Sequence, residues 1–226
     1  MRALAEQLLD LLEVRPGDVA CDLLCDGGTV TAALGAAGVQ VVAVDVRSHL
    51  IEIAAGEATA TGAVRGSLTD GRRIELEDAG CALVASLLTL GFGDVARLLG
   101  ESARLLRPGG RMAIAVWDAE HPPPHERALR DALASAGHDS AFLRGVLPSL
   151  DSAHATAVRR FHDVARFDGS AHAWAALVDD RPLGDEVAKL SQTVVDEVRR
   201  QFDEALGGFA GADGTLRIPV EALVLS

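Results

Sequence analysis

Residues 19–29 read Val-Ala-Cys-Asp-Leu-Leu-Cys-Asp-Gly-Gly-Thr, and residues 41–45 read Val-Val-Ala-Val-Asp. An apolar run, a glycine turn, a helix, a second apolar run and a terminal acid predict a nucleotide-binding βαβ unit. The terminal acid, Asp45, follows Gly28 by about the interval at which a ribose-binding carboxylate belongs. These two stretches therefore predict an α/β fold.

Strand-like and helical patterns alternate on both sides of this unit. The alternation predicts a doubly wound, Rossmann-like sheet that is mostly parallel, with helices on both faces. The expected strands are residues 19–24, 39–44, 63–64, 81–88 and 111–117, and the expected helices are residues 2–13, 29–37, 49–56 and 94–106.

The pattern changes at the three prolines of residues 122–124, which favour an extended connector. Pro219 falls within the last strand-like run, where a proline argues for an edge strand or a bulge. The elements expected in this part are helices at 126–136, 171–178 and 184–206 and strands at 158–167 and 215–225.

The composition excludes several classes of protein. The formal net charge is −12, which disfavours binding to a phosphate backbone, so nucleic acid is not expected as a partner. No apolar stretch approaches the roughly 20 residues of a membrane span, and the absence of a targeting segment points to the cytoplasm. The three cysteines, Cys21, Cys25 and Cys81, form neither a disulfide framework nor a metal site.

The order of these pieces resembles a known family. Asp22 and Leu23 head a turn that ends at Gly28, Asp45 closes the second strand, and Arg107-Pro108-Gly109-Gly110 precedes an apolar strand. This order is similar to that of the class I S-adenosylmethionine-dependent methyltransferases, in the small-molecule branch sometimes called type 11. The resemblance implies methyl transfer from S-adenosylmethionine to a small molecule, and a seven-stranded sheet whose last strand is antiparallel.

The resemblance also divides the chain. Residues 1–226 are expected to form a single methyltransferase-like domain. Residues 1–118 would be its cofactor-binding half, residues 119–157 a candidate lid over the crevice, and residues 158–226 the segment that completes the sheet.

The family's chemistry assigns roles to particular residues. A glycine turn and a helix N-terminus receive the amino-carboxylate of the cofactor, and an acid after the second strand accepts the ribose hydroxyls. His121 and His125 follow the fifth strand, where a substrate would bind, and are the candidate catalytic bases. The cofactor-binding residues implied are Asp22, Asp26, Gly27, Gly28, Asp45 and Ser67.

Three positions depart from the family's pattern. Against Asp-Leu-Gly-x-Gly-x-Gly, Leu24 replaces the first glycine and Asp26 the second, and Ser67 stands where an acid is expected near the third strand. These departures keep an alternative open, in which the fold has lost methyl transfer and serves as a partner subunit or for another reaction such as cyclisation. A homodimer or a heteromeric partner is compatible with either hypothesis. A nicotinamide dehydrogenase is disfavoured, because the turn lacks Gly-x-Gly-x-x-Gly and the chain has no tyrosine.

Overall fold

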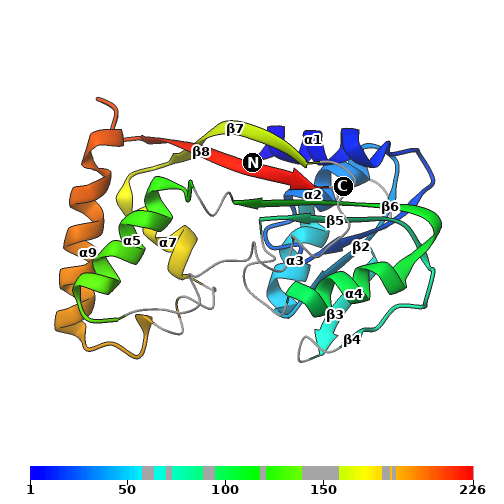
Figure 1. The fold of residues 1–226 in the computed structure, drawn as a ribbon, viewed down its shortest axis with the longest axis horizontal. Coiled ribbons are helices and arrows are strands. Elements are labelled where there is room, and N and C mark those ends of the chain that lie inside the picture. Colours follow the sequence, from blue (N-terminus) through cyan, green and yellow to red (C-terminus); the bar gives the residue numbers. More distant parts are fainter. Residues whose placement is uncertain are drawn as a thin grey trace. The chain divides into compact units, whose positions relative to one another are not determined.

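The fold is described from a computed structural model (Figure 1). The chain folds into two compact units. The first unit comprises Met1–Val116, Val146–Phe161 and Ala222–Ser226, and the second comprises Trp117–Gly145 and His162–Glu221. The expectation of a single domain stays a prediction. The residues that the structure describes are 1–57, 64–69, 73–88, 95–117, 121–138, 158–179, 184 and 187–225.

The first unit is built on a mainly parallel sheet. Strand β1 (Val19–Leu23) lies at its centre, between β2 (Gln40–Asp45) and β5 (Cys81–Leu87), and both pairings are parallel. Cys21 pairs in register with Val42 on one side and with Val84 on the other. The neighbours farther out are β3 (Val64–Thr69), parallel to β2, and β6 (Leu106–Trp117), parallel to β5.

Helices connect these strands. The crossover from β1 to β2 runs in one direction along the sheet, and the crossover from β5 to β6 runs in the other. Because parallel crossovers are right-handed, α2 and α4 lie on opposite faces of the sheet. Helix α2 packs between α1 and α3. The helices of this unit are α1 (Arg2–Leu12), α2 (Thr29–Ala36), α3 (Ser48–Glu57) and α4 (Val95–Leu105).

The predicted fold class is confirmed, but the predicted number of seven strands is wrong. Six strands, β1 to β6, pair with one another in the first unit, and one of them, β4 (Arg73–Ile74), is antiparallel to β3. Two residues of β4 are too few to give a readable pattern. The full strand order in the described residues is β4-β3-β2-β1-β5-β6-β8-β7. The antiparallel direction expected of the last strand stays a prediction.

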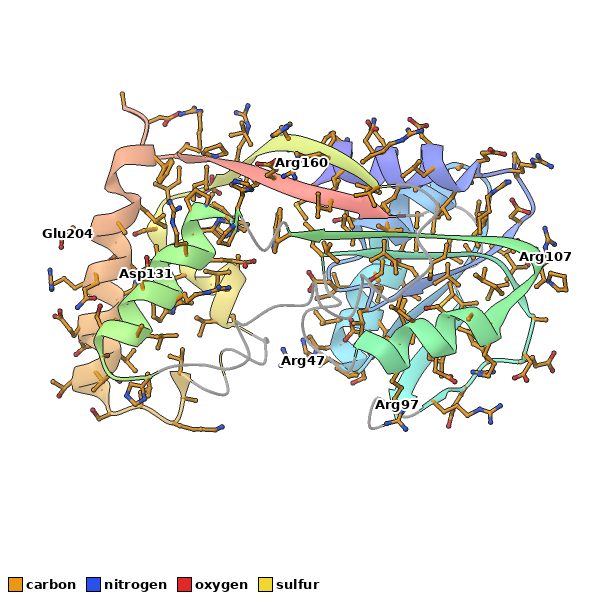
Figure 2. All side chains as sticks on the ribbon, viewed as in Figure 1. Arg47, Arg97, Arg107, Asp131, Arg160 and Glu204 are labelled. Carbon is orange, nitrogen blue, oxygen red and sulfur yellow. The ribbon has the colours of Figure 1, made fainter. Side chains whose placement is uncertain are left out.

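The Arg107–Gly110 segment, expected as a turn before a strand, lies inside β6. Gly109 has φ of 77°, and the pairing of β5 with β6 shifts register between Cys81 and Leu83. The segment therefore forms an irregularity at the start of the strand, as a glycine with positive φ allows. Figure 2 shows Arg107 at the end of β6 that is remote from the carboxyl ends of the parallel strands.

The core of the first unit is made of small and branched side chains. Its main cluster includes Cys21, Val44, Val84 and Ile114, all of them buried. A second cluster joins Cys25 and Ala43 to the α3 residues Ile51 and Ala54. The chain has few aromatic residues, so aliphatic and cysteine side chains supply the apolar burial that stabilises this unit.

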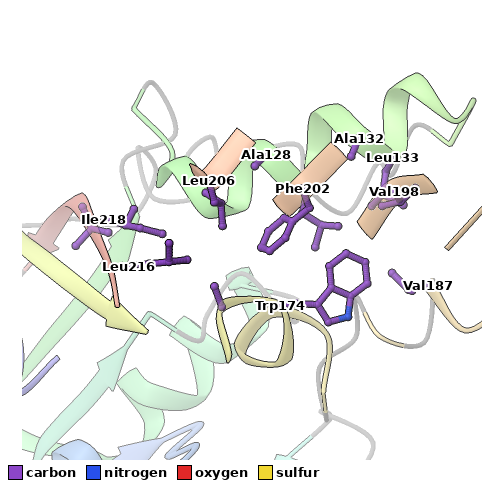
Figure 3. Packing of buried hydrophobic residues seen from close by; sticks show 13 residues of the cluster. Ala128, Ala132, Leu133, Trp174, Val187, Val198, Phe202, Leu206, Leu216 and Ile218 are labelled. Carbon is purple, nitrogen blue, oxygen red and sulfur yellow. The ribbon is translucent and has the colours of Figure 1, made fainter. Parts of the chain in front are cut away.

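The second unit has a core of its own. Trp174 and Phe202 meet edge to face at 5.4 Å between ring centroids (Figure 3). The Arg199 guanidinium lies 4.9 Å from the centroid of the Trp174 ring. The helices around these residues are α5 (Pro124–Ser135), α7 (Ser170–Val178), α9 (Gln192–Leu206) and the short η3 (Gly207–Phe209); β7 (Val158–Phe167) and β8 (Leu216–Leu225) contribute their greater parts.

Two expectations for this unit are corrected. The helix expected over 184–206 is not continuous, because Ser191 has an extended backbone and α9 begins after it. Strand β8, which contains Pro219, lies between β6 and β7 in the strand order, so it is not an edge strand, and the alternative of a bulge at Pro219 stays a prediction. Of the candidate lid, residues 121–138 are described and hold α5; the remainder lies outside the described residues.

Candidate functional site

The site predicted from the sequence lies at the carboxyl ends of β1 and β2. The order of strands along the sheet reverses between β1 and β5, and open α/β sheets bind ligands at such a switch point. The turn that leaves β1 begins at Leu24, and Gly28 caps the N-terminus of α2. Asp45 ends β2 beside this turn.

The turn has the backbone conformation of a glycine motif. The three positions at which the family's pattern has glycine all have positive φ: 57° at Leu24, 47° at Asp26 and 79° at Gly28. An L-residue in this region is held there at a cost of roughly 1–2 kcal/mol, although Asp tolerates it better than most. The departures from the pattern therefore change the side chains of the turn, but the backbone keeps its positive φ at all three positions.

Hydrogen bonds hold this path. The Cys25 backbone N–H donates to the Val44 carbonyl at 3.0 Å, and the Gly28 N–H donates to the Cys25 carbonyl at 2.9 Å. The Asp26 N–H donates to Oδ2 of Asp45 at 3.2 Å. The turn is thus tied to β2 at two points, one of which is a side chain of the predicted site.

The two glycines of the turn have different roles. A Cβ built on Gly28 would lie 2.5 Å from the Cα of Ala54 in α3, so this position has no room for a side chain. A Cβ on Gly27 would meet nothing within 4 Å. Gly28 is therefore required by the close approach of α3, whereas Gly27 is exposed and unrestricted.

The Leu24 side chain packs into the protein. Leu24 is 8% exposed and belongs to the main core cluster, together with Leu98 of α4 and Val116 of β6. Asp26 differs, since it is only partly buried. The bulky Leu24 side chain, which stands where the family's pattern has a glycine, is therefore buried in the core.

Asp45 is buried and braced. It is 4% exposed, and its Oδ1 accepts a hydrogen bond from the Arg47 backbone N–H at 3.1 Å, while Oδ2 accepts from Asp26. Burial raises the pKa of Asp45, and the backbone hydrogen bonds from Asp26 and Arg47 oppose that rise. Each carboxylate oxygen keeps a second lone pair, with which Asp45 can accept hydroxyl groups.

Asp22 supports the turn by joining β1 to the first turn of α2. It is 1% exposed, and the Thr31 hydroxyl in α2 donates to its Oδ2 at 2.5 Å. Burial raises the pKa of Asp22 to about 7; the Thr31 hydrogen bonds lower it, and the nearby Asp45 and Asp26 raise it. Asp22 joins β1 to α2 and does not reach the surface, so its place fits a bracing residue.

The sequence did not single out two residues that matter here. Thr31 holds Asp22, and its only signal was a hydroxyl in the first turn of the helix. Arg47 follows Asp45 by two positions at the carboxyl edge of the sheet (Figure 2). Its Nη1 is buried and makes no hydrogen bond to any described residue. Ser67 pairs with Asp45 across β2 and β3, which agrees with its expected position.

The two candidate bases lie in different surroundings. His121 is exposed, whereas His125 is the second residue of α5 and is 4% exposed. Burial lowers the pKa of His125 to about 4, so its ring is neutral at pH 7. Both belong to the second unit.

The three cysteines are free and buried, and burial raises the pKa of each thiol. Among the described residues, no group of three or more His, Cys, Asp or Glu side chains has the arrangement of a metal site. No helix in the described part of the chain is both long and apolar enough to cross a membrane.

Comparison with known proteins gives matches over the same region. Residues 21–114 match the family model described as "Methyltransferase domain". An uncharacterized 37.1 kDa protein in transposon TN4556 of Streptomyces fradiae is 34% identical over 126 residues, which are 52% of this chain and 36% of that protein. The nocamycin O-methyltransferase of Saccharothrix syringae is 33% identical over 132 residues, 56% of this chain and 46% of that protein. This chain thus spans less than half the length of both curated relatives.

The fold recurs among solved structures. The phosphoethanolamine N-methyltransferase 2 of Haemonchus contortus, in complex with S-adenosyl-L-methionine, superposes with a TM-score of 0.56 at 16% identity. The superposition covers 99% of this chain and 52% of that chain. At this identity the likeness concerns the fold alone.

Proposed function

We propose that this chain, whose residues 21–114 match the family model described as "Methyltransferase domain", is a class I methyltransferase that transfers a methyl group from S-adenosylmethionine to a small molecule. The observation that carries the proposal is the turn after β1. Leu24, Asp26 and Gly28 share the positive φ of a glycine motif, and Asp45 braces that turn from the end of β2. No observation on the described residues favours the alternative of a fold without methyl transfer.

The residues at the turn fit the proposed cofactor. The first turn of α2 begins at Gly28, and a helix N-terminus with its backbone N–H groups attracts a carboxylate. Asp45 would accept the ribose hydroxyls, with Ser67 beside it on β3. Gly27, which has open space around it, would let the ligand approach the backbone.

The charges at the turn favour this cofactor over a dinucleotide. Asp22, Asp26 and Asp45 place three carboxyl groups around one turn. S-adenosylmethionine carries a sulfonium and an ammonium group, which the acids attract, and one carboxylate, which Asp26 repels. A dinucleotide would instead bring a pyrophosphate to this helix N-terminus, where Asp26 would repel it.

The proposed reaction mainly requires the protein to align the acceptor with the methyl group of the cofactor. S-adenosylmethionine supplies an electrophilic methyl group when it is bound. The protein holds the acceptor in line with that group and excludes water, and a base is added where the acceptor is weakly nucleophilic. The O-methyltransferase among the relatives supports an acceptor that is a small molecule with a hydroxyl group. We place the protein in the cytoplasm and expect no resident metal ion.

Protection against unfolding by S-adenosylhomocysteine tests the proposal. A ligand that binds only the folded state raises the midpoint of thermal unfolding. We expect this rise in the wild type, its loss in Asp45→Ala, and the wild-type rise in Asp10→Ala, which removes an exposed acid in α1. A wild type that millimolar S-adenosylhomocysteine leaves unprotected would overturn the proposal.

A further inference from the structure

A cluster of aromatic rings gathers at one place in the second unit. The Trp117 ring lies 6.5 Å from the His125 ring, the His125 ring 5.1 Å from Phe167, and the Phe167 ring 5.7 Å from His172. Four elements meet there: the end of β6, the start of α5, the end of β7 and the start of α7. We call these four residues the ring cluster. Only 4% of the chain is Phe, Trp or Tyr, so the cluster is a marked concentration of aromatic side chains.

His125 is the member of the ring cluster that has a buried polar atom without a hydrogen-bond partner in the described part of the chain. Its side chain is 4% exposed, and its Nδ1 is buried without a hydrogen-bond partner in the described part of the chain. A buried polar atom without a partner is uncommon in folded proteins and calls for an explanation. His172 offers a contrast, because its Nδ1 accepts a hydrogen bond from the Asp168 backbone N–H at 3.1 Å.

The surroundings of His125 restrict the chemical class of ligand that could donate a hydrogen bond to its Nδ1. Trp117 and Phe167 are half-buried, so their rings give an apolar surface that is partly open to solvent. Neither ring carries a charge, and the low pKa of His125 keeps its imidazole neutral at pH 7. A neutral imidazole nitrogen accepts a hydrogen bond from a neutral hydroxyl group, and the aromatic edges pack against an apolar ring.

We propose that the ring cluster is a binding site for a neutral ring compound whose hydroxyl group donates a hydrogen bond to Nδ1 of His125. This binding does not rest on the proposed function, because all four residues belong to the second unit and none belongs to the turn after β1.

A matched pair of probes tests the binding without any cofactor. The probes are p-cresol and toluene, which differ by one hydroxyl group. The Trp174→Phe variant leaves Trp117 as the only tryptophan of the chain, so its fluorescence reports on the ring cluster. We expect p-cresol to bind about tenfold more tightly than toluene, as one hydrogen bond to a buried acceptor implies.

Substitutions of His125 show whether Nδ1 is the acceptor. In the same background, His125→Phe keeps a ring and removes the acceptor, so the preference for p-cresol should disappear. His125→Asn returns a polar atom near the position of Nδ1 and should restore part of the preference. His162→Phe makes the same change at an exposed position of β7 and should leave the preference intact. Thermal unfolding of each variant confirms that it is folded.

The outcomes separate this inference from the proposed function. Equal binding of the two probes, or a preference that survives in His125→Phe, would overturn the inference even if S-adenosylhomocysteine protects the protein. A preference that depends on His125, in a protein that does not bind S-adenosylhomocysteine, would support the ring cluster as a binding site and overturn methyl transfer. Absence of binding by both probes at millimolar concentration would also overturn the inference.

Discussion

Leu24 and Asp26 occupy two glycine positions of the turn in different ways. Both have positive φ, but the Leu24 side chain is buried in the main core cluster whereas Asp26 is partly buried at the turn. Leu24 therefore gains apolar burial that offsets its backbone strain. Asp26 has no such gain, and its charge lies where the carboxylate of the proposed cofactor would bind.

Replacement of Asp26 by glycine should improve the site. Asp26→Gly relieves a positive φ and removes a negative charge, so we expect S-adenosylmethionine to bind severalfold more tightly, as measured by calorimetry. The free energy of unfolding should rise by up to about 1 kcal/mol. Asp26→Ala separates the two effects, because it should keep the gain in affinity without the gain in stability. Weaker binding in both variants would mean that Asp26 contacts the ligand favourably.

Replacement of Leu24 by glycine should have the opposite effect on stability. The variant relieves a similar strain but removes a buried side chain, and a core truncation of this kind costs about 2–5 kcal/mol. We expect a net loss in the free energy of unfolding in urea, with little change in affinity for S-adenosylmethionine. Leu24→Met, which conserves volume, should be close to wild type. A stabilised Leu24→Gly protein would contradict the placement of this side chain in the core.

The buried Asp22 should make stability depend on pH. Burial raises its pKa to about 7 in the folded protein, so the folded state holds a proton that the unfolded state releases near pH 4. Stability should therefore fall as the pH rises from about 4 to 7, by about 1.4 kcal/mol for each unit of pKa difference.

Asp22→Asn tests this effect, because the amide keeps an acceptor for Thr31 and cannot ionise. Urea unfolding at pH 5 and pH 8 should show a smaller loss in the variant than in the wild type. Equal losses in the two proteins would show that Asp22 does not titrate in this range.

At the scale of elements, Gly28 and Gly27 form a matched pair. Gly28→Ala would bring a Cβ to 2.5 Å from the Cα of Ala54 and force alanine into positive φ, so α3 must move away from the turn. We expect a loss of roughly 2–4 kcal/mol in the free energy of unfolding. Gly27→Ala, with nothing within 4 Å of the new Cβ, should stay within about 0.5 kcal/mol of wild type. Similar losses in both would contradict the close packing of α3 on Gly28.

The elements differ in how well the sequence predicted them. Strands β1, β2, β5 and β7 were predicted to within about one residue, because continuous or alternating apolar runs identify buried strands. The two-residue β4 gives no period, and a glycine bulge at the start of β6 reads as a turn. The break before α9 depends on the extended backbone of Ser191, which residue type does not reveal.

The sequence predicted where the candidate site residues lie in the fold, but not their detailed conformation. Asp45 and Gly28 were expected near each other from their interval along the chain, since topology brings the ends of β1 and β2 together. The conformation of Leu24 could not be read from the sequence, because leucine seldom adopts positive φ. Likewise, the burial of His125 Nδ1 without a hydrogen-bond partner among the described residues could not be predicted. The rings that pack against His125 come from β6 and β7, which are far apart in the chain.

At the scale of the whole molecule, the net charge of the chain decides whether nucleic acid is an expected partner. The net charge of −12 should keep the protein from binding nucleic acid. We expect no mobility shift of a short DNA duplex at about 0.15 M salt, with protein in the range of about 10 μM. A shift that weakens as salt is added would reveal a cluster of basic residues and would reopen nucleic acid as a substrate.

The whole chain is proposed to bind S-adenosylmethionine through a turn that keeps one of the three glycines of the family's pattern. Calorimetric titration of the wild-type protein with S-adenosylmethionine tests this most directly. We predict binding of one molecule per chain with a dissociation constant in the micromolar range, weakened at least tenfold in Asp45→Asn. No heat of binding at millimolar cofactor, from a protein shown to be folded, would contradict the account.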